Sequence, residues 1–211
     1  MSFLKKIAAI ATATVLSSSA AFAVTLDFTT GALPFSGTEL GGWTLTFVPD
    51  APDVSETGPG LLPLANGDTL AGTTDGVGIL GDELDGGGMQ YAVLTFVEEV
   101  FLTNVYGLDH FANATVNDQE EMRVTVGAAP GAIDASLMAT DTGGIGFSDL
   151  VTSLRGTTFT FWAGEGNDGA GKPDFALAGV TVAPIPLPAS ALLLLGAVGG
   201  LGAMRRRAKR A

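Results

Sequence analysis

The chain has 211 residues, contains no cysteine and carries a formal net charge of −12 at pH 7. Without cysteine it forms no disulfide, no thiolate metal site, no catalytic thiol and no lipid anchor on cysteine. Residues 24–188 hold three basic residues against all 22 acidic ones, a net charge of −19. Such a field argues against a partner made of nucleic acid or anionic lipid.

The first 23 residues have the three parts of a secretory signal peptide. Lys5 and Lys6 form a positive start, residues 7–16 are apolar, and Ala21-Phe22-Ala23 has the small-x-small pattern of a cleavage site. The apolar run is too short to cross about 30 Å of hydrocarbon, which disfavours an uncleaved membrane anchor. We therefore expect export, followed by cleavage after Ala23 by signal peptidase.

Several segments between residues 25 and 183 have the composition of β-strands. Residues 25–30 and 43–47 alternate apolar with polar side chains, a pattern that buries one face of a strand. The runs 90–97 and 100–108 are more apolar, and the two residues between them, Glu98-Glu99, predict a hairpin of central strands. Further strands are predicted over residues 121–127, 158–164 and 175–183.

Segments rich in glycine and aspartate separate these runs, and no stretch before Pro188 has a sustained helical period. We therefore predict an all-β domain, an antiparallel β-sandwich of about seven to nine strands with jelly-roll-like connections. The chain then divides into a signal peptide (1–23), this ectodomain (24–182) and a C-terminal segment (183–211).

Two of the separating loops hold oxygen ligands of the kind that Ca²⁺ binds. Their spacing matches neither an EF-hand nor the glycine-rich repeats that bind calcium, although the acidic charge favours divalent cations. Asp and Asn beside Gly are also ordinary turn residues, so a structural Ca²⁺ and a plain turn both stay open. No other cofactor is expected. The candidate ligands are Asp75, Asp82, Asp85, Asn167 and Asp168.

No segment has the pattern of a catalytic site. The sequence lacks a Gly-x-Ser-x-Gly elbow, a His-Glu-x-x-His helix and a phosphate-binding loop. The single histidine, His110, is interpreted as a hydrogen-bonded turn residue rather than a base. Glu98-Glu99 and Glu120-Glu121 are neighbours in sequence, and neighbouring side chains on a strand point to opposite faces, so neither pair flanks one glycosidic bond. We expect a protein that is not an enzyme.

The end of the chain combines an uncharged run with a basic cluster. Residues 187–204 contain no charged side chain, and as a helix they span about 27 Å, just enough to cross a bilayer. The basic residues that follow stay on the cytoplasmic side by the positive-inside rule. They are Arg205, Arg206, Arg207, Lys209 and Arg210.

This tail resembles the PEP-CTERM class of bacterial sorting signals, in the variant named VPLPA-CTERM. The motif residues are Ile185, Pro186, Leu187, Pro188 and Ala189, with isoleucine in place of the valine in the motif's name. The resemblance covers residues 185–211 and implies recognition by an exosortase, a membrane protease that transfers or releases the ectodomain at the cell envelope.

The prolines at 184, 186 and 188 also favour an extended segment that a membrane protease is able to grip. The alternative is a juxtamembrane spacer, which accounts for neither the glycine-rich helix nor the abrupt basic end.

Two function classes follow. The favoured one is an exported, exosortase-sorted protein of the cell envelope or extracellular matrix, anchored in the inner membrane until processing and then at the cell surface or outside the cell. Its non-enzymatic β-sandwich would act in adhesion or polysaccharide association, with Tyr91, Tyr106 and Trp162 as candidates for stacking on sugars. The other is a carbohydrate-active or other hydrolytic ectodomain on the same tail, which requires a cleft with two converging carboxylates.

Overall fold

The computed structural model describes residues 22–32, 35–54, 57–79, 83–86, 89–112, 119–142, 145–164, 173–186 and 197. The predicted signal peptide before Phe22 lies outside these residues, as does the predicted transmembrane helix apart from Ala197. The whole basic cluster is outside them too. Among the described residues, no helix is both long enough and apolar enough to cross a membrane.

The described part of the chain is an antiparallel β structure with almost no helix, as the alternating sequence patterns predicted. A short 3₁₀ turn, η1 (Glu39–Gly41), precedes β3. The strands are β1 (Val24–Asp27), β2 (Ser36–Gly37), β3 (Trp43–Val48), β4 (Leu62–Pro63), β5 (Thr69–Leu70), β6 (Tyr91–Leu108), β7 (Glu121–Val126), β8 (Ala135–Met138), β9 (Ser148–Ala163) and β10 (Ala176–Pro184).

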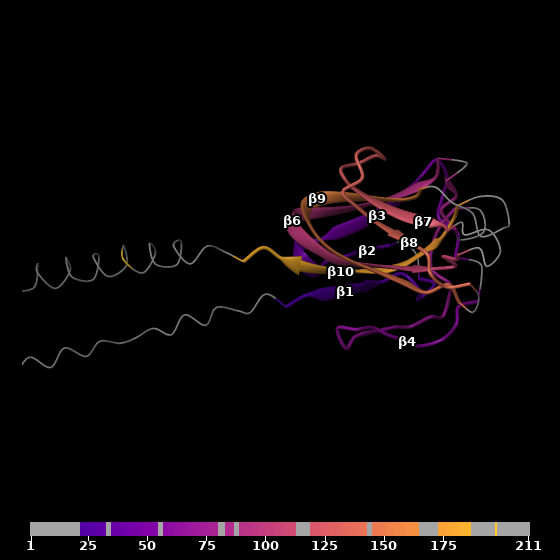
Figure 1. The fold of residues 1–211 in the computed structure, drawn as a ribbon. Coiled ribbons are helices and arrows are strands. Elements are labelled where there is room, and N and C mark those ends of the chain that lie inside the picture. Colours follow the sequence, from indigo (N-terminus) through magenta and orange to yellow (C-terminus); the bar gives the residue numbers. More distant parts are fainter. Residues whose placement is uncertain are drawn as a thin grey trace, which may run out of the picture.

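One large sheet holds most of these strands, in the order β1-β10-β6-β9-β7-β8 (Figure 1). β3 also pairs with β6, and β2 pairs with β3. All of these pairs are antiparallel. A separate small hairpin, β4–β5, lies beside β1 and β10 in Figure 1.

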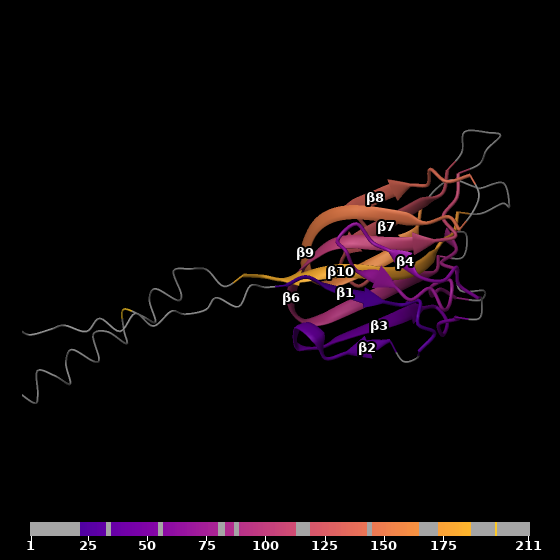
Figure 2. The same ribbon diagram turned by 90° about the horizontal axis from the view of Figure 1, so that it is seen from below.

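The sheet bends back on itself near the middle of its two longest strands, β6 and β9 (Figures 1 and 2). Both strands are continuous, but the pairing between them shifts register there. Thr95 pairs with Thr158 and Val100 pairs with Gly156, so residues 96–99 of β6 lie opposite Thr157 alone. The first half of β6 lies between β3 and β9, and its second half lies between β10 and β9. Extra residues of this kind kink a strand and increase its twist.

The predicted hairpin at Glu98-Glu99 is therefore wrong, since β6 runs without a reversal from Tyr91 to Leu108. The physical reason lies in the backbone that a two-residue hairpin needs. Its turn places one or both central residues at positive φ, which Asn-Gly or Asp-Gly accept and two glutamates disfavour. A bulge instead accommodates extra residues in one strand while that strand keeps its direction.

A single hydrophobic cluster joins the two halves of the bent sheet. Leu94 and Phe96 of β6 contribute from the first half, and Leu102 of the same strand contributes from the second. Phe159 and Phe161 of β9 and Val180 and Val182 of β10 are also buried in this cluster. Burying one such side chain contributes about 1.5–3 kcal/mol. The arrangement fits the expected β-sandwich.

A second, smaller cluster lies beneath the β4–β5 hairpin and includes Leu64, Leu70, Tyr106 and Leu108. The Tyr106 hydroxyl is 2.9 Å from the Thr181 hydroxyl, so the polar end of this buried ring is satisfied. The hairpin thus covers the outer face of β10 and of the second half of β6.

The chain enters and leaves the domain at the same end, where the sheet bends (Figure 1). Val24, the first residue of β1, pairs with Val182, and Pro184, the last residue of β10, pairs with Val100. The opposite end is where β6 begins at Tyr91 and β10 begins at Ala176. We call these the bend end and the loop end.

Candidate functional site

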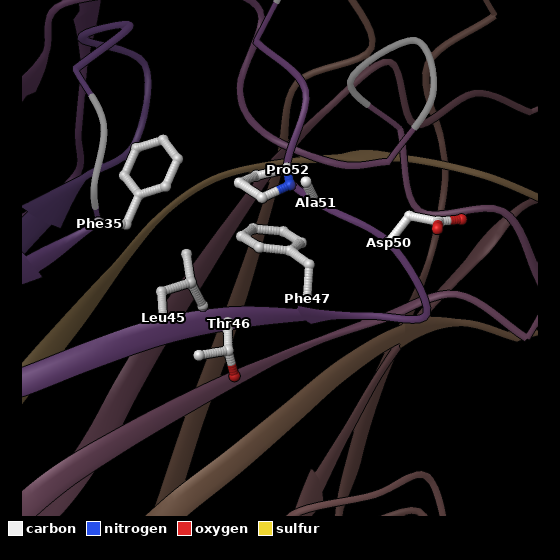
Figure 3. Close-up of a pocket in the computed structure, with 7 residues that line it drawn as sticks. All are labelled: Phe35, Leu45, Thr46, Phe47, Asp50, Ala51 and Pro52. Carbon is white, nitrogen blue, oxygen red and sulfur yellow. The ribbon is translucent and has the colours of Figure 1, made fainter.

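An open hollow of about 480 Å³ lies along β3, toward the loop end (Figure 3). β3 contributes Leu45, Thr46 and Phe47 to its lining. In Figure 3 Leu45 and Phe47 lie on the side of Phe35, Thr46 points to the other side, and the turn after the strand places Pro52 over the ring of Phe47. The rings of Phe35 and Phe47 are 6.4 Å apart between centroids. Asp50 is the one carboxylate among the lining residues, and in Figure 3 it points away from the rings.

A second open hollow, of about 490 Å³, lies at the other end of β3 near the bend end. Trp43 stands in its wall and donates its indole N–H to a Glu39 carboxylate oxygen at 2.9 Å. The pKa of Glu39 is lowered by its own backbone amide first and by this indole second, so the exposed carboxylate is charged at neutral pH. The hollow is lined by Ser36, Gly37, Gly42, Trp43, Thr44, Thr95, Phe96 and Val97.

The two hollows differ in their carboxylates. Among the described residues that line them, the first has one carboxylate and the second has none. A glycosidase of the usual kind needs two carboxylates that flank one bond. The described lining of neither hollow supplies such a pair.

Two of the three aromatic residues proposed for sugar stacking come together, and the third does not. Tyr106 is buried beneath the β4–β5 hairpin and is not available to a ligand. Tyr91 and Trp162 are direct cross-strand partners on β6 and β9, and both are partly exposed. Directly paired side chains lie on the same face of a sheet. They thus form one aromatic surface on the outer face.

Arg123 extends this surface onto the next strand. It pairs with Trp162 in register, and its guanidinium carbon lies 5.0 Å from the centre of the indole ring. The Trp162 N–H donates to the Thr125 hydroxyl at 3.2 Å, and Glu121 forms an ion pair with Arg123. A Cβ on Gly164 would collide with the Arg123 side chain, so glycine is needed there for this packing. We call Tyr91, Trp162 and Arg123 the aromatic row.

His110 is fully buried and is not accessible as a base. Its Nδ1 lies 2.6 Å from the Ser148 hydroxyl, and its ring meets the ring of Phe175 edge-on. Burial lowers its pKa from 6.5 to about 4, because it disfavours the charged ring; a hydrogen bond with the Glu120 backbone and the charge of Glu121 oppose this effect. The histidine is therefore neutral at pH 7.

The adjacent glutamates Glu120 and Glu121, set aside above as a catalytic pair, both have structural partners. A Glu120 carboxylate oxygen accepts the Phe111 backbone N–H at 2.7 Å, and Glu121 pairs with Arg123. Both residues are buried. The other pair, Glu98 and Glu99, is exposed at the bend, where Glu99 forms an ion pair with Arg155 at 2.6 Å. The described geometry brings neither pair to a cleft.

The calcium prediction stays a prediction. Asp82, Asn167 and Asp168 lie outside the described residues, which include Asp75 and Asp85. Within the described ranges no group of three His, Cys, Asp or Glu side chains is arranged to hold a metal ion.

The predicted processing segments lie directly beside the fold. Ala23 immediately precedes β1, whereas Ala21 is outside the described residues. Ile185 and Pro186 immediately follow β10, whereas Leu187, Pro188 and Ala189 are outside.

Sequence reasoning missed Arg123 as a member of the aromatic row and Glu39 and Trp43 as parts of a surface hollow. Arg123 and Trp162 are brought together only by the register of β7 on β9. Glu39 and Trp43 are four residues apart, and a turn between them was the one signal that could have placed them together. Comparison of the chain with protein-family models, curated proteins and solved structures finds no match.

Proposed function

We propose that this is an exported protein of the cell envelope or extracellular matrix, sorted through its C-terminal tail by an exosortase. Its β domain, a two-layered sandwich with jelly-roll-like connections, is a non-enzymatic module for adhesion or polysaccharide association. It is held in the inner membrane by residues 187–204 until the tail is processed, and it then remains at the cell surface or leaves the cell.

The pairing of Val24 with Val182 carries this proposal. It brings the first and last strands together, with the predicted signal cleavage site one residue before β1 and the predicted sorting motif one residue after β10. Both proposed cuts therefore leave all ten described strands intact. A domain whose limits coincide with two processing segments is what an exported and sorted cargo requires.

The aromatic row supports the polysaccharide part of the proposal. Aromatic rings offer a flat apolar face to the C–H side of a sugar. Tyr91 and Trp162 provide two partly exposed rings from neighbouring strands, and Arg123 packs beside Trp162.

The test is the intact mass of the protein recovered from cells and from medium, in matched strains with and without an active exosortase. We expect loss of residues 1–23 in both strains. Loss of the C-terminal tail is expected only where the exosortase is active. Retention of residues 1–23 would contradict export through signal peptidase, and tail loss that is equal in both strains would contradict sorting by this enzyme.

A further inference from the structure

The bend end of the domain is the part closest to the membrane if the proposed function holds, and the following inference rests on it. Pro184 is the last paired residue of β10, and only Ile185 and Pro186 separate it from residue 187, where the predicted membrane span begins. The three Cα-to-Cα steps from Pro184 to residue 187 span at most about 11 Å. The headgroup layer of one leaflet takes up about 5–7 Å of this distance, so the bend end lies within a few ångströms of the membrane surface and of any protein that surrounds the tail.

The surface at this end has a defined shape. The bulge of β6 presents Val97, whose side chain is 75% exposed, next to exposed Glu98 and Glu99. The Val97 backbone N–H donates to the Gly42 carbonyl at 3.0 Å, which attaches the bulge to the turn after η1. The second hollow opens beside Val97, with Trp43 in its wall. We call Glu39, Val97, Glu98, Glu99 and this hollow the bend surface.

The bend surface is negatively charged, and this charge favours some binding partners over others. Three exposed carboxylates, those of Glu39, Glu98 and Glu99, face a single described cation, Arg155, which is paired with Glu99. Anionic lipid headgroups repel such a surface. A protein with basic residues at the membrane face attracts it and is steered toward it.

We propose that the bend surface is the docking site for the membrane-embedded exosortase that processes the tail. Basic residues of the enzyme pair with Glu39 and Glu98, and an apolar side chain enters the hollow beside Val97. The short connection between β10 and the sorting motif makes this contact unavoidable during processing. Recognition then depends on the folded domain as well as on the tail.

Site-specific photo-crosslinking of the full chain tests the contact in membranes. A benzophenone amino acid is placed at Val97 or, as the matched control, at Met89. Both side chains are 75% exposed, and Met89 lies before the start of β6, at the loop end. We expect an adduct with the exosortase from position 97 and none from position 89. No enzyme adduct from position 97, or equal adducts from both positions, would overturn the inference.

Variants that remove negative charge test the same surface through the rate of tail removal. Glu39→Gln with Glu98→Gln removes two carboxylates and leaves the Glu99–Arg155 pair intact. Asp50→Asn with Asp53→Asn removes two charges from the loop end as a control. Pulse-chase measurement of tail removal should show the first variant slowed by about fivefold or more and the second unchanged.

The outcomes separate the two proposals. If the wild-type tail is removed and both charge variants keep the wild-type rate, the docking inference fails while the proposed function stands. If both variants are slowed equally, net charge and not the bend surface matters, and the inference fails as well. If the wild-type tail is never removed by the exosortase, both proposals fall.

Discussion

Val24 and Val182 are direct partners in an antiparallel pair, although almost the whole folded chain separates them. Among the described strands β1 pairs with β10 alone, so the first strand completes its pairing only when the last strand is in place. If the chain is exported as proposed, we expect Ala23 to be accessible to signal peptidase before the domain closes.

Residues 24–184 should fold without either flanking segment. All described strands lie within these limits, and so does every residue of the two hydrophobic clusters. We expect a β-type far-ultraviolet circular dichroism spectrum and a cooperative thermal transition. A fragment that begins at residue 28 is the informative comparison, because it lacks β1 and the buried Leu26. It should lose about 2–5 kcal/mol of unfolding free energy. Equal melting temperatures for the two fragments would show that β1 is dispensable.

Acid should destabilise the domain through His110. Its pKa is about 4 in the folded state against 6.5 in the unfolded chain, so the unfolded state binds the proton first as the pH falls. The stability that the neutral ring contributes is complete above pH 6.5 and is lost progressively toward pH 4. The loss amounts to about 3 kcal/mol. Urea unfolding at a series of pH values measures it.

His110→Asn is the variant that isolates this effect, since its side chain does not titrate. We expect lower stability at pH 7 and a shallower fall between pH 6.5 and 4 than in the wild type. The carboxylates titrate in both proteins and cancel in the comparison. Identical slopes would assign the acid sensitivity to groups other than His110.

Trp162→Ala should weaken binding to extracellular polysaccharide from the producing cells. The substitution removes one ring of the aromatic row and the surface on which Arg123 packs. Loss of about 1 kcal/mol of contact corresponds to roughly fivefold weaker binding. Retardation in polysaccharide-containing gels measures it with the 24–184 fragment.

Tyr106→Phe is the control for that measurement, because Tyr106 is buried and the change removes only its hydroxyl. It should lower stability by about 1 kcal/mol and leave polysaccharide binding unchanged. If both variants bind like the wild type, the aromatic row is not the contact surface.

Strands with strict alternation were predictable from the sequence, and those with irregular patterns were not. Residues 43–47 and 121–127 correspond to β3 (Trp43–Val48) and β7 (Glu121–Val126) within one residue at each end. β8 was missed because only four residues form it and none of them is fully buried. The first half of β9 was missed because polar residues and Arg155 interrupt its apolar positions.

The candidate surfaces could not be identified from local sequence patterns, because they are formed by residues that are far apart in the sequence or by an irregular stretch of one strand. Tyr91 and Trp162 were recognised as aromatic residues of interest, but their pairing follows from the register of β6 on β9. The bend surface exists because residues 96–99 form a bulge, which the apolar runs on either side of Glu98-Glu99 do not reveal. Only the pairing of β6 with β9 locates the bulge.

The basic cluster and the prolines of the tail should have separable roles. If the chain is exported as proposed, residues 187–204 should halt in the bilayer, because Arg205, Arg206 and Arg207 would have to cross against the positive-inside bias. Pro186→Ala with Pro188→Ala keeps the apolar length and the charges, so membrane insertion should be unchanged. Maturation should be blocked, because alanine at both positions no longer favours the extended backbone that we expect the protease to recognise. Fractionation and intact mass measure both steps.

Replacing Arg205, Arg206 and Arg207 with neutral residues should have the converse effect and disturb retention in the membrane before any processing. Pro184 serves as the internal control for the proline variant, since it is paired within β10 and its replacement by alanine should leave maturation unchanged. Release of the Pro186→Ala, Pro188→Ala double variant at the wild-type rate, in a strain with an active exosortase, would show that the motif is not recognised. The tail would then be a plain anchor, and the close approach of β10 to the membrane would set only the height of the domain above the lipid.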